Sequence, residues 1–499
     1  MCKVRKNPNS LIVIIISSIF VFFHFGLSFM VSYQPDIYCT INSPDALVRS
    51  YIYPGGRLVL ALIVWLIRKP IQSYYAFYYI SLTLSMVVLD VVVIVFSKTI
   101  IRRLQKKTKH ELPLETIICA GLISCLTITN LFSAEFGLYP NSFLGFAIDI
   151  LLCVFCSILF IKIVDGESSY KDVIAIVACL VFAVFIYEPV LAVFVILSSL
   201  FSIIESQDFK SFVKLQIYCA LFYGFAMSVK LVYTKFIINS SRAQFSEASF
   251  AETAKEAVMS GRLPEVYIVD RITFGMWTYA VVSLVVVGII AYRTITLKRY
   301  CLLLKMIYLS LVTIIMGILP FVLRLSNDYK PRIYYPLGLY FGVLIIYGLL
   351  SGTIMADNIN DKRIVISCVV VMVCAQWLSF VQMNVDQYVT NYDDKQISGI
   401  IGNCIDEYEA VGSQKVKYVV FYCDEVRTKY IRNNGWCITE RAYDAAWSKL
   451  PALNFYLGRE YQQGITDAEI AEYYANKNWN AFSPDQVIIK GDTAHVCTF

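Results

Sequence analysis

The segment that follows the first long apolar stretch carries two carboxylates and two arginines: Asp36, Asp45, Arg49 and Arg57. A carboxylate beside a membrane surface can act as a general base that takes a proton from a sugar hydroxyl. Arginines close to it can hold a lipid-linked phosphate through charge-assisted hydrogen bonds. Asp45 and Arg49 are also spaced as an i, i+4 pair, which on a short helix contributes only about 0.2–0.5 kcal/mol. The pattern alone leaves both interpretations open.

A second cationic segment precedes another apolar stretch, and it contains Arg324, Lys330 and Arg332. A lipid phosphate at this position would meet charge-assisted hydrogen bonds from these side chains. Anchoring of the chain at the membrane interface is the alternative.

Three further residues lie at the ends of apolar stretches. Glu135 follows Ser133-Ala134, and Tyr187-Glu188-Pro189 separates two short apolar runs. Either glutamate can bind the hydroxyls of an acceptor or assist a base, or it can be a solvated loop residue. Asp90 and Asp149 lie inside apolar stretches, where an ionisable group needs a partner in the bundle interior. Structural hydrogen bonding is the first interpretation for these two, and proton-coupled transport is the alternative.

Eleven apolar stretches must position these residues. Only 16% of the 499 residues are charged, against about 25% in a soluble domain, and about 20 apolar residues suffice to cross a bilayer. The fold class predicted is therefore a polytopic α-helical membrane protein. The predicted spans are 11–32, 71–97, 115–132, 143–163, 172–187, 189–204, 212–234, 272–292, 301–321, 333–352 and 364–381. The short pair 172–187 and 189–204 can also be a re-entrant hairpin.

Lysine and arginine in short loops predict the orientation. The segment from Lys98 to His110 is the most basic one, and it shares a side with the basic N-terminus because two spans separate them. The N-terminus is then inside and the C-terminus outside. The external segments are 33–70, 133–142, 235–271, 322–332 and 382–499. This predicts a transmembrane catalytic part, 1–381, with a first external loop 33–70, and an external C-terminal domain, 382–499.

The polar tail from 382 onward has the pattern of a small α/β domain. A run rich in Val and Tyr, Lys415–Cys423, predicts a strand, and Arg441–Tyr461 has helical spacing. Thr466 to Glu469 resembles a capping box that opens a helix to about Tyr474. Gln486–Phe499 predicts two strands around the turn dipeptide Gly491-Asp492.

Cysteines and aromatic residues give the tail further possible roles. At least one disulfide is expected among Cys404, Cys423, Cys437 and Cys497 if the tail lies in an oxidising space. Trp436, Trp447 and Trp479 can stack on sugar rings or pack in a core.

Two amphipathic segments are expected to lie along the membrane surface. They are residues 57–67, followed by Arg68 and Lys69 that would snorkel to the interface, and Phe245–Met259.

Taken together, Asp45-x-x-x-Arg49 followed by Gly56-Arg57, Tyr187-Glu188-Pro189 at a mid-chain helix end, and Arg324 to Arg332 before the tenth span give a resemblance. The chain resembles the serotype-converting O-antigen glucosyltransferases of phages and enteric bacteria, the polytopic type with a periplasmic tail. That family is similar to the C-type glycosyltransferases, which use polyprenyl-phosphate sugars. Its members often carry paired acids in the first loop. Here Pro44 precedes Asp45, so that Asp36 is the candidate second acid.

The resemblance implies a periplasmic reaction at the bacterial inner membrane. Glucose would pass from undecaprenyl-phosphate-glucose to a lipid-linked O-antigen repeat unit, and a small flippase and a lipid-glucose synthase would supply the donor. Asp45 would be the general base, with Asp36 second. The expected donor-phosphate ligands are Arg49, Arg57, Arg324, Lys330 and Arg332, and the expected acceptor-binding residues are Glu135, Tyr187, Glu188, Trp436 and Trp447.

No cofactor is required on this interpretation, and dependence on a divalent cation stays open. The three histidines show no zinc-ligand spacing. No Gly-rich phosphate loop is present, so no nucleotide sugar is expected, and the modest charge of +6 gives no reason to expect nucleic-acid binding. A lipid-sugar flippase or transporter is the first alternative. An O-antigen polymerase or ligase is the second, and the external loop 235–271 keeps it open.

Overall fold

The computed structural model describes residues 8–41, 43–53, 55–206, 208–239, 273–324, 331–354, 359–412, 414–423, 441–477, 479 and 481–498. The chain divides into two compact units. The first comprises Met1–Phe29 and Leu47–Val381, and the second comprises Met30–Ala46 and Gln382–Phe499. The predicted domain boundary after residue 381 coincides with this division. Residues 30–46, which we expected within the transmembrane part, group instead with the second unit.

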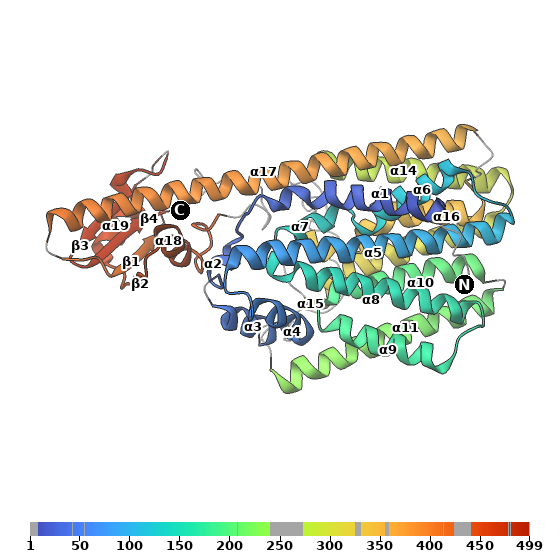
Figure 1. The fold of residues 1–499 in the computed structure, drawn as a ribbon, viewed down its shortest axis with the longest axis horizontal. Helices are drawn as coiled ribbons and strands as arrows, with labels where there is room; N and C mark the ends of the chain where they lie inside the picture. Colours follow the sequence, from blue (N-terminus) through green and yellow to red (C-terminus); the bar gives the residue numbers. More distant parts are fainter. Residues whose placement is uncertain are drawn as a thin grey trace, which may run out of the picture. The chain divides into compact units, whose positions relative to one another are not determined.

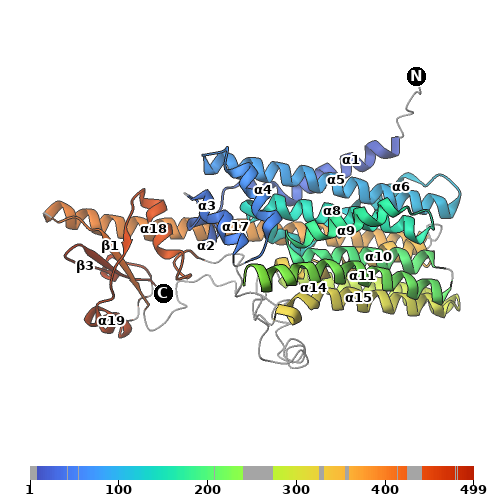
Figure 2. The same ribbon diagram turned by 90° about the horizontal axis from the view of Figure 1, so that it is seen from below.

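The first unit is helical, and its long helices run side by side (Figures 1 and 2). Its α-helices are α1 (Pro8–Phe25), α4 (Leu58–Arg68), α5 (Tyr74–Thr108), α6 (Leu114–Ile128), α7 (Ala134–Gly137), α8 (Pro140–Val164), α9 (Tyr170–Val184), α10 (Ala192–Glu205), α11 (Phe209–Val232), α14 (Thr273–Thr296), α15 (Tyr300–Arg324) and α16 (Tyr340–Ser351). Two helices belong to both units: α3 (Pro44–Ile52) and α17 (Ile359–Val411). Short 3-10 and π segments used below are η2 (Leu131–Ser133), η3 (Glu188–Leu191), η4 (Tyr233–Ile237) and η6 (Pro331–Tyr334).

Among the described residues, eight helices are long and apolar enough to cross a membrane. A ninth is added if α6 and the segment Leu131–Gly137, bent by 49° against it, form one broken span. Each of the eleven predicted apolar stretches is helical, but α9 has 15 residues and α16 has 12. Both are shorter than the roughly 20 residues of a full span. The fold is therefore that of a helical membrane protein, with fewer full-length spans than the eleven predicted.

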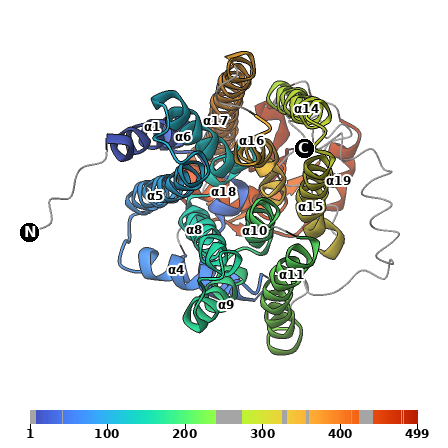
Figure 3. The ribbon, with the colours of Figure 1, turned by 90° about the vertical axis from the view of Figure 1, so that its right-hand side faces the viewer.

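Helix α8 lies at the centre of the first unit. It packs against α5, α9 and α10, as the view along the helices shows (Figure 3). Small residues allow this close approach: a side chain on Gly145 would collide with Leu60 of α4. The hydroxyl of Ser81 on α5 donates to the carbonyl of Pro140 at 2.6 Å. The first turn of α8 is thereby fixed beside α5.

The basic segment at the end of α5 is bound by carboxylates from neighbouring loops. Arg103 makes two hydrogen bonds to Asp165, at 3.0 and 2.5 Å, and lies 3.5 Å from Glu205. Lys107 and Lys305 donate to backbone carbonyls at the ends of α16 and α10, at 2.6 and 2.8 Å. Loops that the charge pattern predicts on one side of the membrane thus lie together at one end of the unit.

Arg68, at the end of α4, does not snorkel as predicted. Its side chain is buried and donates to the carbonyls of Ile71 and Gln72. Its guanidinium also lies over the ring of Phe77, 5.5 Å from the centroid. Arg68 therefore satisfies backbone carbonyls after the helix end, and the exposed residue of the pair is Lys69.

The second unit contains a four-stranded sheet of order β2-β1-β4-β3. Strand β1 (Tyr418–Tyr422) is parallel to both β2 (Gln462–Gln463) and β4 (Thr493–Cys497), whereas β3 (Val487–Lys490) is antiparallel to β4. The helices of this unit are α2 (Pro35–Tyr38), α18 (Lys449–Leu457), α19 (Ala468–Ala475) and the later part of α17. The strand predicted in 415–423 and the strand pair around Gly491 are confirmed.

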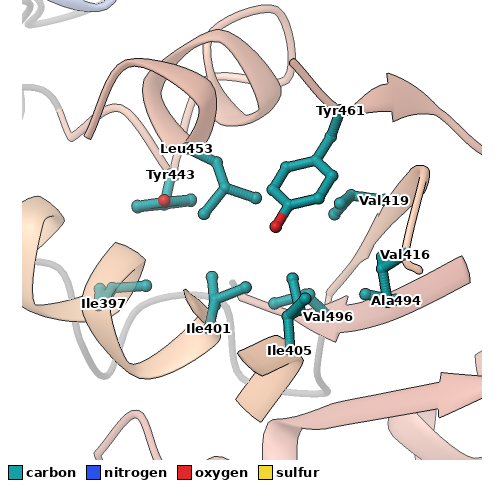
Figure 4. Packing of buried hydrophobic residues seen from close by; sticks show 10 residues of the cluster. All are labelled: Ile397, Ile401, Ile405, Val416, Val419, Tyr443, Leu453, Tyr461, Ala494 and Val496. Carbon is teal, nitrogen blue, oxygen red and sulfur yellow. The ribbon is translucent and has the colours of Figure 1, made fainter. Parts of the chain in front are cut away.

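One face of this sheet is covered by α17. Ile397, Ile401 and Ile405 recur every four residues, so that they share one side of the helix, and they pack on β1 and β4 (Figure 4). The remaining members of this buried cluster are Val416, Val419, Tyr443, Leu453, Tyr461, Ala494 and Val496.

Several predicted details of the tail differ from the structure. The N-cap of α19 is Asp467 and not Thr466: its carboxylate accepts the amides of Glu469 and Ile470. The helix predicted over 441–461 is limited to α18. Cys404 and Cys423 are thiols and not half-cystines. Cys437 and the predicted amphipathic helix 245–259 lie outside the described residues.

Candidate functional site

Two cations flank one carboxylate at one end of the first unit. Arg57 is the N-cap of α4, Glu188 opens η3, and Lys230 lies in the last turn of α11. Arg57 Nε lies 3.8 Å from one oxygen of Glu188, and Lys230 Nζ lies 3.4 Å from the other. The side chains of Arg57 and Glu188 are each 13% exposed and that of Lys230 is 4% exposed. The group is therefore nearly removed from solvent, although neither ion pair is at hydrogen-bonding contact of about 2.8 Å.

A glycine turn holds Lys230 in this position. Helix α3 ends when the amides of Gly56 and Arg57 donate to the carbonyls of Ile52 and Tyr51, each at 2.9 Å. Gly56 has φ +60°, the left-handed conformation that glycine adopts at helix C-termini. Its carbonyl accepts from Lys230 Nζ at 2.5 Å.

Aromatic rings border both cations. The guanidinium of Arg57 lies 4.8 Å from the centroid of the Tyr187 ring, and Lys230 Nζ lies 5.3 Å from that of Phe185. Cations over aromatic faces are stabilised by about 0.5–2 kcal/mol, more when desolvated. Pro189 stands at the start of η3, where its missing amide is not needed. The residues around Glu188 thus fix the direction of its carboxylate toward the cations.

A second ion pair lies close to the first. Glu135 of α7 is fully buried and accepts both the backbone amide of Arg332, at 2.6 Å, and its guanidinium. Arg332 also lies over the ring of Tyr139, 4.5 Å from the centroid. Burial alone would lower the pKa of Arg332, but the Glu135 carboxylate raises it well above the usual value. This pair is tight, in contrast to the Glu188 group.

Tyr187 connects the two pairs. Its ring faces Arg57, and its hydroxyl group interacts electrostatically with Arg332. Segments η3 and η6, which carry Glu188 and Arg332, are also in contact. The three cations Arg57, Lys230 and Arg332 exceed the two carboxylates by one positive charge. A nearly buried region with excess positive charge and polarisable walls is suited to bind an anion.

Asp149 of α8 lies next to the Glu188 group. It is fully buried and interacts electrostatically with Glu188 and Lys230. Its Oδ1 has the Cys153 thiol at 3.8 Å, and its Oδ2 has no hydrogen-bond partner in the described part of the chain. Ionised carboxylates are rarely left in this condition, because burying an unpaired charge is very unfavourable.

The second unit brings two of the predicted site residues together. Trp447 Nε1 donates to Asp36 Oδ1 at 3.0 Å. Trp447 is 57% exposed, and its carbonyl accepts from the Cys39 thiol at 3.2 Å. Burial, and then Asp36, raises the pKa of that thiol. An exposed indole ring is thereby held by its edge, with a carboxylate beside it. Trp479, in contrast, packs on Tyr474 with ring centroids 5.9 Å apart, which is a core contact.

The other predicted residues are placed as follows. Asp45 and Arg49 are exposed, in the first and last turns of α3. Arg324 is the last residue of α15, and its side chain is outside the described part of the chain. Lys330 and Trp436 also lie outside it. Of the predicted residues, the structure therefore groups Arg57, Tyr187, Glu188, Glu135 and Arg332 in one region.

The sequence analysis missed Lys230. It falls in the apolar stretch 212–234, where it was counted as part of a span. The signal that could have found it is its charge, because an ionisable residue within a membrane span indicates a functional or structural partner. Its partners lie more than 40 residues before it in the chain, and no spacing rule connects them.

Within the described residues, no group of three or more His, Cys, Asp or Glu side chains could hold a metal ion. What the geometry offers instead is a set of fixed cations for an anionic group. No family model, curated protein or solved structure matches the chain.

Proposed function

We propose that the protein is a membrane glycosyltransferase that moves a sugar from a polyprenyl-phosphate donor to a polysaccharide acceptor. The resemblance names the donor as undecaprenyl-phosphate-glucose and the acceptor as a lipid-linked O-antigen repeat unit. The observation that carries the proposal is the pair Arg57 and Lys230 around Glu188. Arg57 was predicted as a ligand of the donor phosphate, and the structure adds a second cation beside it.

The donor phosphate would bind between Arg57 and Lys230, with Arg332 adding positive charge nearby. In the reaction an acceptor hydroxyl attacks the anomeric carbon, and the bond from that carbon to the phosphate oxygen breaks. The hydroxyl proton passes to a carboxylate, for which the first-loop pattern proposes Asp45, with Asp36 second. The phosphate leaves with an additional negative charge, which fixed cations in a region of low dielectric stabilise. A single displacement of this kind inverts the anomeric configuration.

The acceptor would be held by the second unit. A half-exposed Trp447 whose edge is fixed by Asp36 offers a flat face to a sugar ring and a carboxylate to its hydroxyls. This contact supports the predicted acceptor role of Trp447. Asp36 would then position the ring as well as bind hydroxyls.

The proposed topology follows the charge pattern. The N-terminus is in the cytoplasm, the chain crosses the bacterial inner membrane about eleven times, and the second unit is in the periplasm. The charges of Arg103 and Lys305 both act on Lys107, so these three residues lie near one another at the proposed cytoplasmic ends of their spans. This grouping supports the topology, because basic loops favour the cytoplasm. A small flippase and a lipid-glucose synthase would provide the donor at the periplasmic face.

Arg57→Gln and Lys230→Gln test the proposal. Each should lower sugar transfer from undecaprenyl-phosphate-glucose in isolated membranes by about 100-fold or more, as does removal of one group that stabilises a developing oxyanion. Lys305→Gln is the matched control: it removes a lysine that caps carbonyls near the end of α10, and transfer per folded protein should be unchanged. Equal transfer by all three variants would exclude Arg57 and Lys230 from the donor site.

A lipid-sugar flippase is the second candidate, because Asp149 is a fully buried carboxyl group inside the helical unit. Transport needs such a group in the membrane but does not need the second unit. Deletion of 385–499 separates the two functions: a transferase loses activity, whereas a flippase still moves lipid-linked glucose across proteoliposomes. No described feature favours the polymerase or ligase.

A further inference from the structure

We propose that Glu188 is an internal substitute for the donor phosphate, and that it keeps ordinary membrane phospholipids out of the cation pair. This inference rests on the proposed function, since it concerns the same binding site. It assigns Glu188 a role in selecting the donor, beyond the acceptor role that the sequence predicted.

The first argument is the geometry of the ion pairs. Glu188 presents one oxygen to Arg57 at 3.8 Å and the other to Lys230 at 3.4 Å. The two oxygens of a phosphodiester could make the same contacts. Glu135, by comparison, is hydrogen-bonded to both the backbone and the side chain of Arg332. Glu188 is therefore the carboxylate that an entering anion can displace.

The second argument is the environment of the cations. Lys230 is anchored by the Gly56 carbonyl at 2.5 Å, and Arg57 is held against Tyr187, so both cations stay in place when Glu188 moves. Two nearly buried cations without a counter-ion would be unfavourable. In a membrane, where phosphodiester head groups are abundant, such a pair would also bind any anionic lipid. An attached carboxylate prevents this, because only a ligand with further contacts displaces it.

The third argument concerns protons. Within the described residues, the charged and titratable groups that face Glu188 are Arg57 of α4, Lys230 and Tyr223 of α11, Tyr187 before η3 and Asp149 of α8. Arg332 lies beyond Tyr187. When a phosphodiester takes both cations, Glu188 remains beside a second anion and near Asp149. A carboxylate in that position gains a proton, so donor binding is coupled to proton uptake.

Binding to the purified full-length protein tests this. The probe is a short-chain isoprenyl phosphodiester of glucose, whose one acidic group is ionised throughout the range of about pH 6–8. If Glu188 occupies the cations for about nine-tenths of the time, it lowers the apparent affinity about tenfold. Glu188→Gln should therefore bind the probe about tenfold more tightly than the wild type at pH 8. It should also co-purify with phosphatidylglycerol, detected by mass spectrometry.

The pH response is the second measurement. Uptake of one proton changes affinity by up to about tenfold per pH unit, so wild-type affinity should rise at least about fivefold from pH 8 to pH 6. Glu188→Gln should show no such rise. Glu205→Gln is the matched control, since Glu205 lies 3.5 Å from Arg103 in another loose ion pair. It should behave as the wild type in both measurements.

The outcomes are distinguishable. If wild type and Glu188→Gln bind the probe equally and with the same pH response, the inference is wrong while the proposed donor site stands. If neither binds the probe, the proposed function fails with it. Should Glu188→Gln not fold, Glu188→Asp withdraws the carboxylate by one methylene. It should bind more tightly than the wild type, and affinity at or below the wild-type value would overturn the inference.

Discussion

Replacement of Gly56 by alanine should disturb the donor site by a mechanism that can be divided into two parts. Gly56 has φ +60°, and a Cβ at this position would lie 2.5 Å from Cγ2 of Thr234 and 3.5 Å from Lys230 Nζ. The left-handed conformation costs a residue with a side chain about 1–2 kcal/mol. Crowding against a packed methyl group costs about 1–3 kcal/mol more. Gly56→Ala should therefore destabilise the protein by about 2–5 kcal/mol.

Two other variants separate these contributions. Gly166 has φ +74°, and a Cβ added there would have no atom within 4 Å, so Gly166→Ala should cost only the conformational part, about 1–2 kcal/mol. Thr234→Ser removes the methyl group and keeps the hydroxyl that donates to the Lys230 carbonyl at 2.9 Å. The double variant Gly56→Ala with Thr234→Ser should regain the crowding energy. Its stability loss, corrected for Thr234→Ser alone, should approach that of Gly166→Ala.

The assay is a double-mutant cycle on thermal unfolding of the purified protein in one detergent, with probe binding measured in parallel. A coupling energy of about 1–3 kcal/mol between positions 56 and 234 is expected, because neighbouring residues that collide do not act additively. Donor affinity should fall in Gly56→Ala and recover in the double variant. Strict additivity would show that α11 and η4 do not press on the glycine turn, and the assigned position of Lys230 would be wrong.

Two further predictions concern the second unit. Burial lowers the pKa of His495, whose Nδ1 lies 2.8 Å from the Tyr422 hydroxyl, so the neutral imidazole is favoured in the fold; the stability that it contributes is present above the usual pKa of about 6.5 and is lost as pH falls through the lowered value. Hydrogen exchange of β4 should accelerate between about pH 7 and pH 5 after correction for intrinsic rates, and His495→Gln should remove this response; a response that persists in the variant would contradict the assignment. Trp447→Phe keeps a ring but loses the bond to Asp36, so the acceptor KM should rise about fivefold, equivalent to about 1 kcal/mol for one hydrogen bond, with kcat nearly constant. A change in kcat alone would count against acceptor binding.

The helical segments were predictable because each has a local cause. A long apolar stretch such as 143–163 must form a helix in a membrane, since every backbone group has to be satisfied within the segment. The strand at 415–423 and the turn at Gly491 also follow from local residue types. Span length was less predictable: α9 and α16 are shortened by the breaks before Tyr187 and Tyr340, where turns and 3-10 segments replace the α-helix.

The candidate site was predicted only in part. Arg57 and Glu188 were both identified as charged residues at the ends of apolar stretches, yet their contact was not, because only tertiary packing brings them together. The same holds for Asp36 and Trp447, which are separated by 411 positions in the chain. Arg68 was wrongly placed at the interface because its sequence neighbours do not reveal the carbonyls of Ile71 and Gln72 that it satisfies.

Strand β1 has a partner that the ribosome delivers late. Its five residues pair with β4, which begins at Thr493 and separates β1 from β3. At a synthesis rate of about 5–20 residues per second, β1 waits about 4–15 seconds for this neighbour. During that time Tyr-Val-Val-Phe-Tyr is an uncovered β-prone segment of the kind that aggregates. Biogenesis of this protein should accordingly depend on a chaperone that shields emerging strands, and its depletion should produce insoluble chains with correctly inserted helices.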